Sequence, residues 1–283
     1  MRLSTVKIAG RTTWGVVEAD SFRDVGAHLA SRYPDLKAAI TAGFAGVKES
    51  VASAAATPIA DVEWLPVVPN PDKILCVGLN YEMHRKETGR TEVENPTIFA
   101  RYANSQTGHL APIVRPKVST NLDFEGELAV IIGKPGRYIS QAEAMSHVAG
   151  YACYNDGSVR DFQYHTHQFT PGKNFPDTGA FGPWMMTPDE LGPLADLRLQ
   201  TRLNGEVVQE ATFAQMIFDI ARQIEYCSSF TRLEAGDVIV SGTPGGVGAK
   251  RNPPLWMRPG DVVEVEIDKL GVLRNPITDE TAA

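Results

Sequence analysis

The chain has 283 residues, of which 43% are hydrophobic and 22% charged, a composition typical of a globular protein with a full core. Its net charge is -7 and its Lys and Arg residues are scattered, so no basic stripe marks a nucleic-acid partner. The longest clear apolar run, residues 128–132, is far shorter than the roughly 20 residues that span a bilayer, and no apolar signal core follows Met1. Since the three cysteines lie far apart without a CxxC pair, we expect a soluble, cytoplasmic protein with buried, reduced thiols.

The first 70 residues have the pattern of a small α+β unit. Residues 7–18 predict a short hairpin, with Gly10-Arg11 near its turn. Residues 24–56 are Ala-rich and helical in pattern, interrupted by Pro34. Several prolines in residues 64–71 indicate an extended linker. We therefore expect a small N-terminal domain with its linker at residues 1–70 and a catalytic domain at residues 71–283.

The next segments alternate between strands and helices. Residues 73–78 predict a short strand, and residues 80–90 a polar, exposed helix. Residues 127–133 are typical of a buried strand. A capping box at Ser140 predicts a helix that Gly150 ends, and residues 150–155 return to a strand pattern.

Strands dominate the last part of the chain. A capping box at Thr212 precedes apolar residues at helical spacing, namely Phe213, Met216, Ile217, Ile220 and Ile224. Residues 237–241 predict a strand that leads into a Gly-rich turn at 242–246, and residues 261–267 alternate with their valines and isoleucine inward. Leu270-Gly271 then turns toward a last strand near Leu273. Without a βαβ rhythm, the sequence predicts an α+β, mainly β fold and not a Rossmann sheet.

Glu125 and Glu127 form the most informative pair of residues. Side chains two apart in a strand lie on the same face, and buried carboxylates repel each other unless a proton or a cation intervenes. Gly126 between them allows another segment to approach closely. Glu264 and Glu266 have the same spacing on what reads as a solvent face, so spacing alone does not identify a metal site.

Asp156 is the candidate third ligand. If a helix begins there, Arg160 and Gln163 follow at i+4 and i+7 on its face, where the guanidinium could hold a substrate carboxylate by two hydrogen bonds. A surface helix with an Asp–Arg pair remains the simpler alternative. Three oxygen ligands would suit a hard cation such as Mg²⁺ or Mn²⁺ better than zinc.

Taken together, these motifs resemble the fumarylacetoacetate hydrolase superfamily, in its bacterial, acylpyruvase-like branch. The matching pieces, in order, are Gly-Leu-Asn-Tyr at 78–81 with His84, Glu-Gly-Glu at 125–127, residues 156–163, Lys173 before Gly-Pro-Trp at 182–184, Asn-Gly-Glu at 204–206, Met-Ile-Phe at 216–218, and residues 236–248. They extend from about residue 72 to 278, and the first 70 residues resemble the small extra domain of longer bacterial members. Leu79, where many relatives have a basic residue, and the His-rich stretch 165–175 depart from the pattern.

The resemblance implies a β-rich catalytic domain peculiar to this superfamily, a homodimer, and a bound divalent cation. The implied cofactor is Mg²⁺ or Mn²⁺, which Ca²⁺ could replace in a crystal, held by Glu125, Glu127 and Asp156. The implied substrate contacts are Tyr81, Arg160, Gln163 and Thr243, with Lys173 as a catalytic residue. His84 and Glu87 match a proton-handling dyad on a lid helix, although by spacing alone they could be a surface pair.

The expected reaction is metal-dependent hydrolysis of a C–C bond in a small, anionic β-diketo acid, such as an acylpyruvate or a fumarylpyruvate-like acid. His84 would deprotonate the attacking water, and the cation with Lys173 would stabilise the enolate that leaves. An oxaloacetate-type decarboxylase, or an oxo-diacid isomerase or tautomerase, could use the same metal site. A non-enzymatic module is disfavoured because the acidic ligands and Lys173 are intact.

Overall fold

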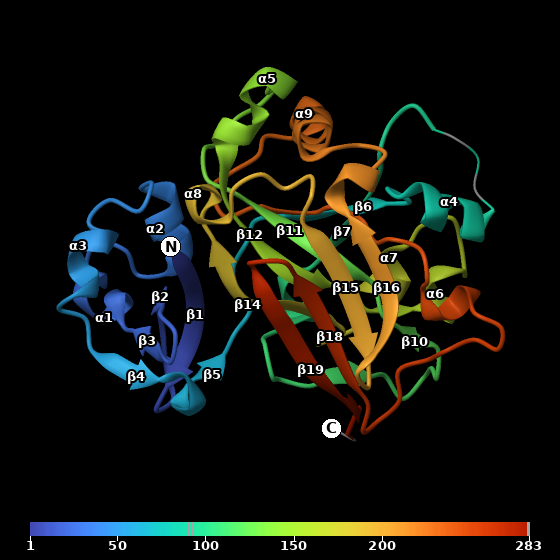
Figure 1. Cartoon of the computed structure of the whole chain (residues 1–283), viewed down its shortest axis with the longest axis horizontal. Coiled ribbons are helices and arrows are strands. Elements are labelled where there is room, and N and C mark those ends of the chain that lie inside the picture. The colour runs from blue at the N-terminus through green and yellow to red at the C-terminus, as the bar shows by residue number, and fades with distance from the viewer. Residues whose placement is uncertain (90, 92, 282–283) are drawn as a thin grey trace.

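The computed structural model describes all residues except 90, 92, 282 and 283, and it contains two main sheets (Figure 1). The larger, twelve-stranded sheet has the order β4-β3-β2-β1-β14-β12-β11-β17-β6-β7, with β5 beside β1 and β8 beside β14. Its strands are β1 (Arg2–Ile8), β2 (Arg11–Val17), β3 (Ser21–Arg23), β4 (Ala56–Pro58), β5 (Glu63–Trp64), β6 (Ile74–Gly78), β7 (Thr97–Arg101), β8 (Gln106–Thr107), β11 (Gly126–Ile132), β12 (Val148–Asn155), β14 (Gly179–Met186) and β17 (Val238–Val240). The mainly β, α+β fold that the sequence predicts is confirmed.

The second sheet has five strands in the order β16-β15-β18-β19-β9 and lies beside the first (Figure 1). Its strands are β9 (Ile113–Arg115), β15 (Arg198–Leu203), β16 (Glu206–Thr212), β18 (Val262–Ile267) and β19 (Gly271–Asp279), and a separate pair joins β10 (Leu122–Asp123) to β13 (Ser158–Val159). In β18 the alternation predicted from the sequence is confirmed, because Val263, Val265 and Ile267 are buried.

The helices are short. The α-helices are α1 (Val25–Leu29), α2 (Leu36–Thr41), α3 (Val47–Val51), α4 (Glu82–Thr88), α5 (Gln141–Ala144), α6 (Arg160–Gln163), α7 (Thr170–Lys173), α8 (Pro188–Leu191) and α9 (Ile220–Phe230). The 3₁₀ turns are η1 (Ile59–Asp61), η2 (Ala103–Ser105), η3 (Met145–His147), η4 (Phe213–Gln215) and η5 (Gly248–Lys250). No helix in the described part of the chain is both long and apolar enough to cross a membrane.

Strand β11 lies at the centre of the fold, and all seven of its residues are buried. Leu128, Val130 and Ile132 belong to the core shared with the five-stranded sheet, whereas Ala129 and Ile131 belong to the core shared with the N-terminal helices. Burial on both faces explains why the strand reads as a continuous apolar run instead of an alternation. The strand therefore holds the residues at its start, including Glu127, in a rigid frame.

The N-terminal residues continue the larger sheet. The predicted hairpin is present as β1 and β2, and the helical stretch after it forms α1, α2 and α3. Leu3 of β1 is in register with Met185 of β14, and both side chains lie in the same buried core. Because the sheet passes through this junction, the division near residue 70 stays a prediction.

Two expected helices differ from the prediction, and pairing within the sheet explains the first. α5 ends at Ala144, and Gly150 lies inside β12, where a Cβ would approach Met186 O to 2.6 Å. The apolar residues before and after Gly150 pair with β11 and β14 instead of continuing a helix.

The second difference concerns the segment after Thr212. Its capping box is present, but it closes only the 3₁₀ turn η4. α9 begins later, at Ile220, where the Asp219 side chain accepts a hydrogen bond from Arg222 N at 2.8 Å. Phe213, Met216 and Ile217 therefore do not belong to the face of that helix.

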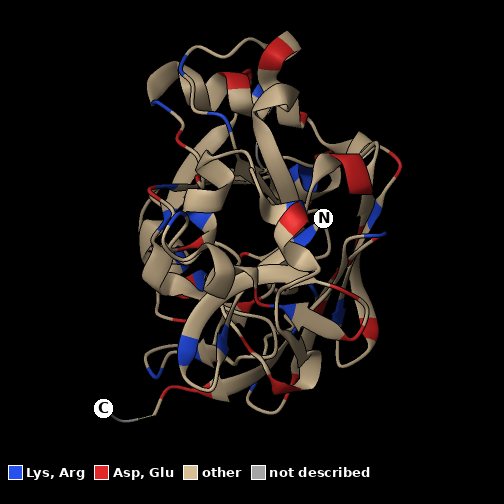
Figure 2. Ribbon diagram, turned by 90° about the vertical axis from the view of Figure 1, so that its left-hand side faces the viewer, with Lys and Arg blue, Asp and Glu red and all other residues tan. Residues whose placement is uncertain are grey.

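The charged residues are distributed over the fold, and the cysteines are buried as the sequence predicts. Figure 2 shows basic and acidic segments interspersed over the ribbon, without a continuous basic stripe in that view. The three cysteines are buried and unpaired. Burial is the largest cause that raises the pKa of each thiol above its ordinary value, to about 12 for Cys153 and Cys227, so these thiols are poor nucleophiles.

Candidate metal centre and active site

Three carboxylates converge where β11 begins and β12 ends. In the register of this strand pair Gly126 lies opposite Asn155, which brings Asp156 beside Glu125, and Asp156 N donates to Glu125 O at 2.8 Å. One carboxylate oxygen from each of Glu125, Glu127 and Asp156 lies within 4.8 Å of the others, and no residue of the three is more than 4% exposed. The close approach expected at Gly126 is also found, since a Cβ there would lie 2.0 Å from Thr201 Oγ1.

Cationic side chains neutralise two of the three carboxylates. Lys173 Nζ lies 2.5 Å from Glu125 Oε2 and 2.5 Å from Asp156 Oδ2, so it bridges the pair. Arg160 adds a contact of 2.5 Å to Glu125, and Arg101 one of 2.5 Å to Asp156. Burial alone would raise the pKa of Glu125, but Arg160 and Lys173 together hold it below its ordinary value.

Glu127 is different because it makes no ion pair with any described residue. Its Oε2 accepts a hydrogen bond from Gly242 N at 2.5 Å, and Gly242 has a φ of 103° and no space for a Cβ beside Asn80. Burial, and then repulsion from Asp156 and Glu125, raises the pKa of Glu127 well above its ordinary value. A buried carboxylate in this situation is stabilised by a proton or by a cation. Three converging oxygen donors therefore fit a hard divalent cation.

The predicted dyad lies on α4, and its surroundings correct one expectation. His84 Nδ1 lies 2.7 Å from Glu87 Oε1, and Glu87 Oε2 accepts from Gly246 N at 3.0 Å. The sequence predicts an exposed helix, yet His84 is only 5% exposed, because the Gly-rich turn packs against α4. If Nδ1 donates to Glu87, Nε2 of the imidazole is left as the proton acceptor.

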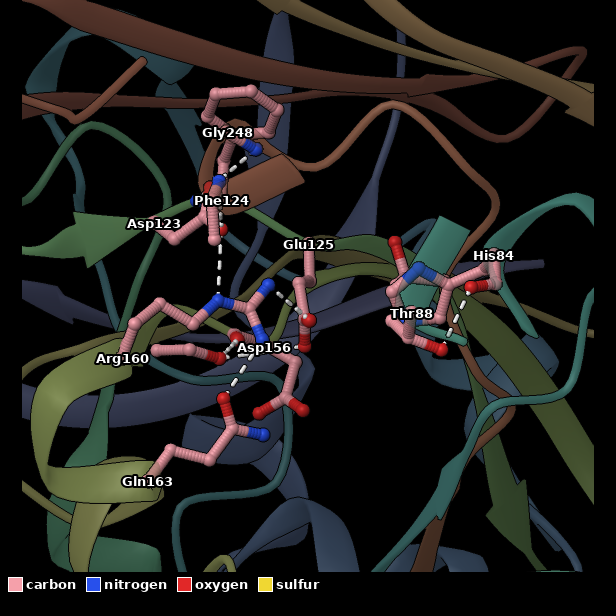
Figure 3. A network of polar contacts seen from close by, with 12 residues as sticks. His84, Thr88, Asp123, Phe124, Glu125, Asp156, Arg160, Gln163 and Gly248 are labelled. Carbon is pink, nitrogen blue, oxygen red and sulfur yellow. Dashed lines mark hydrogen bonds and ion pairs between the residues drawn. The ribbon is translucent and has the colours of Figure 1, made fainter. Parts of the chain in front are cut away.

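A cavity of about 120 Å³ joins the dyad to the carboxylates. Its wall contains eight of the predicted site residues, namely His84, Glu125, Glu127, Asp156, Arg160, Gln163, Lys173 and Thr243. Figure 3 shows Glu125, Asp156, Arg160 and Gln163 converging on one side, with His84 across from them. Glu87 lies behind His84, outside the wall. Tyr81 is also outside it; the residue is 2% exposed, and its hydroxyl has no partner among the described residues.

Arg160 and Gln163 reach the cavity by a different route from the one predicted. α6 includes only residues 160–163, so Asp156 is not on its face, and Arg160 pairs with Asp123 and Glu125 instead of Asp156. Arg160 Nη1 donates to Gln163 Oε1 at 2.8 Å. The predicted i,i+4 and i,i+7 face is wrong, because β13 interposes an extended segment after Asp156.

Thr243 also uses its hydroxyl within the protein. The hydroxyl donates to Gly126 O at 3.0 Å and accepts from Gln209 Nε2 at 2.8 Å. Its contacts tie the Gly-rich turn to the strand that carries Glu127, so the turn is fixed beside the carboxylates.

Sequence reasoning missed three charged residues of the site. Arg101 pairs with Asp156, Asp123 pairs with Arg160, and Lys250 lines the cavity. Asp123 could have been found, because it lies two residues before Glu125 and extends the same-face pattern. Lys250 could also have been found, because it lies two residues after the matching segment 236–248. Arg101 is isolated in the sequence, and only the packing of distant segments brings it to the site.

Comparison with known proteins identifies the family. Residues 73–278 match the profile described as fumarylacetoacetate (FAA) hydrolase C-terminal. The mitochondrial oxaloacetate tautomerase FAHD2A of Homo sapiens is 40% identical over 222 residues, 78% of this chain and 71% of that protein. The fumarylacetoacetate hydrolase of Exiguobacterium antarcticum is 34% identical, with a TM-score of 0.86 over 99% of this chain and 100% of that chain.

A further solved relative carries a metal. Maleylpyruvate hydrolase from Sphingobium sp. SYK-6, in complex with manganese(II) and pyruvate, is 26% identical, with a TM-score of 0.83 over 99% of this chain and 100% of that chain. A divalent cation bound in a relative agrees with three carboxylates able to hold one here. By its sequence over most of its length and by its fold, the chain belongs to the fumarylacetoacetate hydrolase family.

Proposed function

We propose that this protein is a Mg²⁺- or Mn²⁺-dependent enzyme that catalyses keto–enol tautomerisation of a small oxo acid of the oxaloacetate type. The observation that carries the proposal is His84, which contacts Glu87 through Nδ1 and faces the three carboxylates across one small cavity. At about 120 Å³ the cavity is well below the roughly 300–1,000 Å³ of drug-sized pockets, which favours an acid of a few carbons. The oxaloacetate tautomerases among the similar proteins support the same reaction.

Glu125, Glu127 and Asp156 would hold the cation, which when bound supplies a Lewis acid for the oxo and carboxylate oxygens of the substrate. His84 Nε2 would take a proton from the carbon next to the oxo group and return it to the oxygen, with Glu87 holding the ring in the required tautomer. Lys173, already placed between two carboxylates, would stabilise the negative charge on the enolate oxygen. The reaction moves one proton and consumes no water.

Hydrolysis of a C–C bond in an acylpyruvate or fumarylpyruvate-like acid, which the sequence alone favours, is the second candidate. The same dyad could deprotonate a water, and the maleylpyruvate hydrolase fold supports this reaction. Decarboxylation of oxaloacetate needs the cation but no positioned water. Tautomerisation, hydrolysis and decarboxylation give different products, so product analysis distinguishes the three reactions.

The test incubates oxaloacetate with metal-stripped protein and measures the absorbance of the enol before and after Mg²⁺ or Mn²⁺ is added. The Glu125→Ala variant, treated in the same way, is the control. We expect metal-restored loss of the enol without release of pyruvate. Pyruvate from oxaloacetate would favour decarboxylation, and pyruvate with acetate from acetylpyruvate would favour hydrolysis. No turnover of either acid by metal-loaded protein would contradict the proposal.

His84→Asn should lower the tautomerisation rate about 10²–10⁴-fold, the usual contribution of a positioned acid–base group. Cation binding, measured by calorimetry, should stay unchanged, because His84 is not one of the three ligands. Glu82→Gln, on the same helix but 44% exposed at its side chain, is the matched control and should keep the wild-type rate. Wild-type activity in His84→Asn would remove the dyad from the mechanism.

We further propose that the protein is a cytoplasmic homodimer and that residues 1–70 form its small N-terminal domain. Light scattering coupled to size-exclusion chromatography should give twice the 30.8 kDa mass of the chain. A mass of one chain would contradict the dimer.

A further inference from the structure

Lys250 is the cation of the cavity wall that has no acidic partner among the residues that the structure describes. Arg160 and Lys173, in the same wall, are each bound to two carboxylates. Lys250 is exposed, and its Nζ makes no hydrogen bond or ion pair with the described residues. Its charge is therefore available to a ligand in the cavity.

The backbone that carries Lys250 is fixed beside Arg160. Gly248 N and Ala249 N donate to the two carboxylate oxygens of Asp123, at 2.8 and 2.9 Å, and Asp123 also accepts from Arg160 Nε at 2.8 Å. Figure 3 shows this link between Gly248, Asp123 and Arg160. A flexible four-carbon stem on a fixed turn lets the ammonium group adjust to a ligand without moving the site.

The charge balance of the site indicates which ligand group Lys250 would bind. Asp123, Glu125, Glu127 and Asp156 carry four negative charges when ionised, against three positive charges on Arg101, Arg160 and Lys173. A divalent cation turns the net charge of -1 into +1, which one substrate carboxylate neutralises. A second carboxylate would leave an unbalanced negative charge in a largely buried site, unless a further cation lies near it.

We propose that Lys250 binds the distal carboxylate of a dianionic oxo acid, and so makes the enzyme select diacids over monoacids of the same size. This inference rests on the proposed function, because it assumes that the first carboxylate and the oxo group lie at the three-carboxylate centre. Lys250 is a specificity-determining residue and takes no part in the proton transfer.

The test compares two ligands with the same number of non-hydrogen atoms, 2-oxoglutarate and 5-methyl-2-oxohexanoate, by calorimetry on Mg²⁺-loaded protein. In the second ligand an uncharged isopropyl group takes the place of the distal carboxylate. We expect the wild-type protein to bind the diacid roughly five- to tenfold more tightly. The corresponding binding free energy lies between that of an exposed ion pair and that of a hydrogen bond to a charged group. Lys250→Met should remove the preference by weakening diacid binding alone, and Lys250→Arg should retain it. Lys117→Met, at an exposed lysine outside the cavity, should behave as wild type.

The outcomes separate the two proposals. Equal binding of both ligands by the wild-type protein, or an unchanged preference in Lys250→Met, would overturn the role of Lys250 and leave the proposed function intact. Binding of neither ligand would overturn the diacid preference, and the oxaloacetate assay would then decide the proposed function separately. In kinetics, Lys250→Met should raise KM for oxaloacetate by a similar factor and leave kcat nearly unchanged.

Discussion

Glu127→Gln should abolish metal-dependent activity and at the same time raise the melting temperature of the metal-free protein. Glu127 is 2% exposed and pairs with no cation of the described residues, so in the absence of metal its charge is destabilising. Glutamine has nearly the same shape and can still accept the hydrogen bond from Gly242 N. Each kcal/mol that is recovered should raise the melting temperature by roughly 2–4 °C for a chain of this size.

The pH dependence follows from the direction of the Glu127 pKa shift. Because burial and two neighbouring carboxylates raise this pKa in the folded state, the protonated form is favoured by folding. Its stabilising contribution is fully present below the unfolded pKa of about 4.3 and is lost as pH rises through the folded pKa. Metal-free wild-type protein should therefore lose stability from weakly acid toward alkaline pH, and Glu127→Gln should lose less over the same range.

Thermal denaturation at several pH values, with and without Mg²⁺, tests both parts. The cation should stabilise the wild-type protein, by about 2.7 kcal/mol at a hundred times its Kd, and should have little effect on Glu127→Gln. Glu266→Gln is the matched control, since Glu266 is half-buried on β18 and pairs with Arg202 at 2.5 Å. A metal-free Glu127→Gln that melts below the wild-type protein at pH 8 would contradict the prediction.

The comparison of the two Glu-x-Glu pairs shows what sequence can establish. Glu125-Gly-Glu127 and Glu264-Val-Glu266 have the same spacing, but only the first begins a strand that is buried on both faces. The apolar run after Glu127 was the local signal for this burial, so the carboxylate pair could be predicted. The metal-type ligand group found in the described residues is the one predicted, with Asp156 as its third member.

The parts of the site that sequence could not predict depend on distant contacts. The burial of α4 was missed because the turn that covers it, at Gly246, lies 159 residues after Glu87. The shared face of Asp156 and Arg160 depends on a helix that begins at Asp156, yet pairing of β10 with β13 extends the chain between them. Local spacing carries no information on such contacts, whereas it does predict which face of a strand a side chain takes.

Arg101 is the clearest of these missed residues, and Arg101→Met should cause the largest loss of stability. Its guanidinium and the Asp156 carboxylate are both fully buried, 2.5 Å apart, and Arg101 also donates to Gly157 O and Thr178 Oγ1, each at 2.9 Å. Breaking a buried ion pair costs about 3–5 kcal/mol when the remaining charge has no other partner, and this is the upper limit here because Asp156 keeps its contact with Lys173. That loss corresponds to a fall of roughly 6–20 °C in melting temperature.

The same substitution should weaken cation binding. This measurement distinguishes a role of Arg101 in positioning the metal ligand Asp156 from a general loss of stability. Arg101 holds the Asp156 carboxylate by an ion pair outside the cavity wall. Residues that orient a metal ligand in this way usually contribute about 10–100-fold to metal affinity. Arg101→Lys keeps a positive charge beside Asp156 but cannot reach Gly157 O and Thr178 Oγ1 together, so both losses should be smaller. Arg232→Met is the control, because the Arg232–Glu234 pair is exposed and contributes less than about 1 kcal/mol. If Arg101→Met binds Mg²⁺ as tightly as the wild-type protein below its melting temperature, Arg101 stabilises the fold without positioning Asp156.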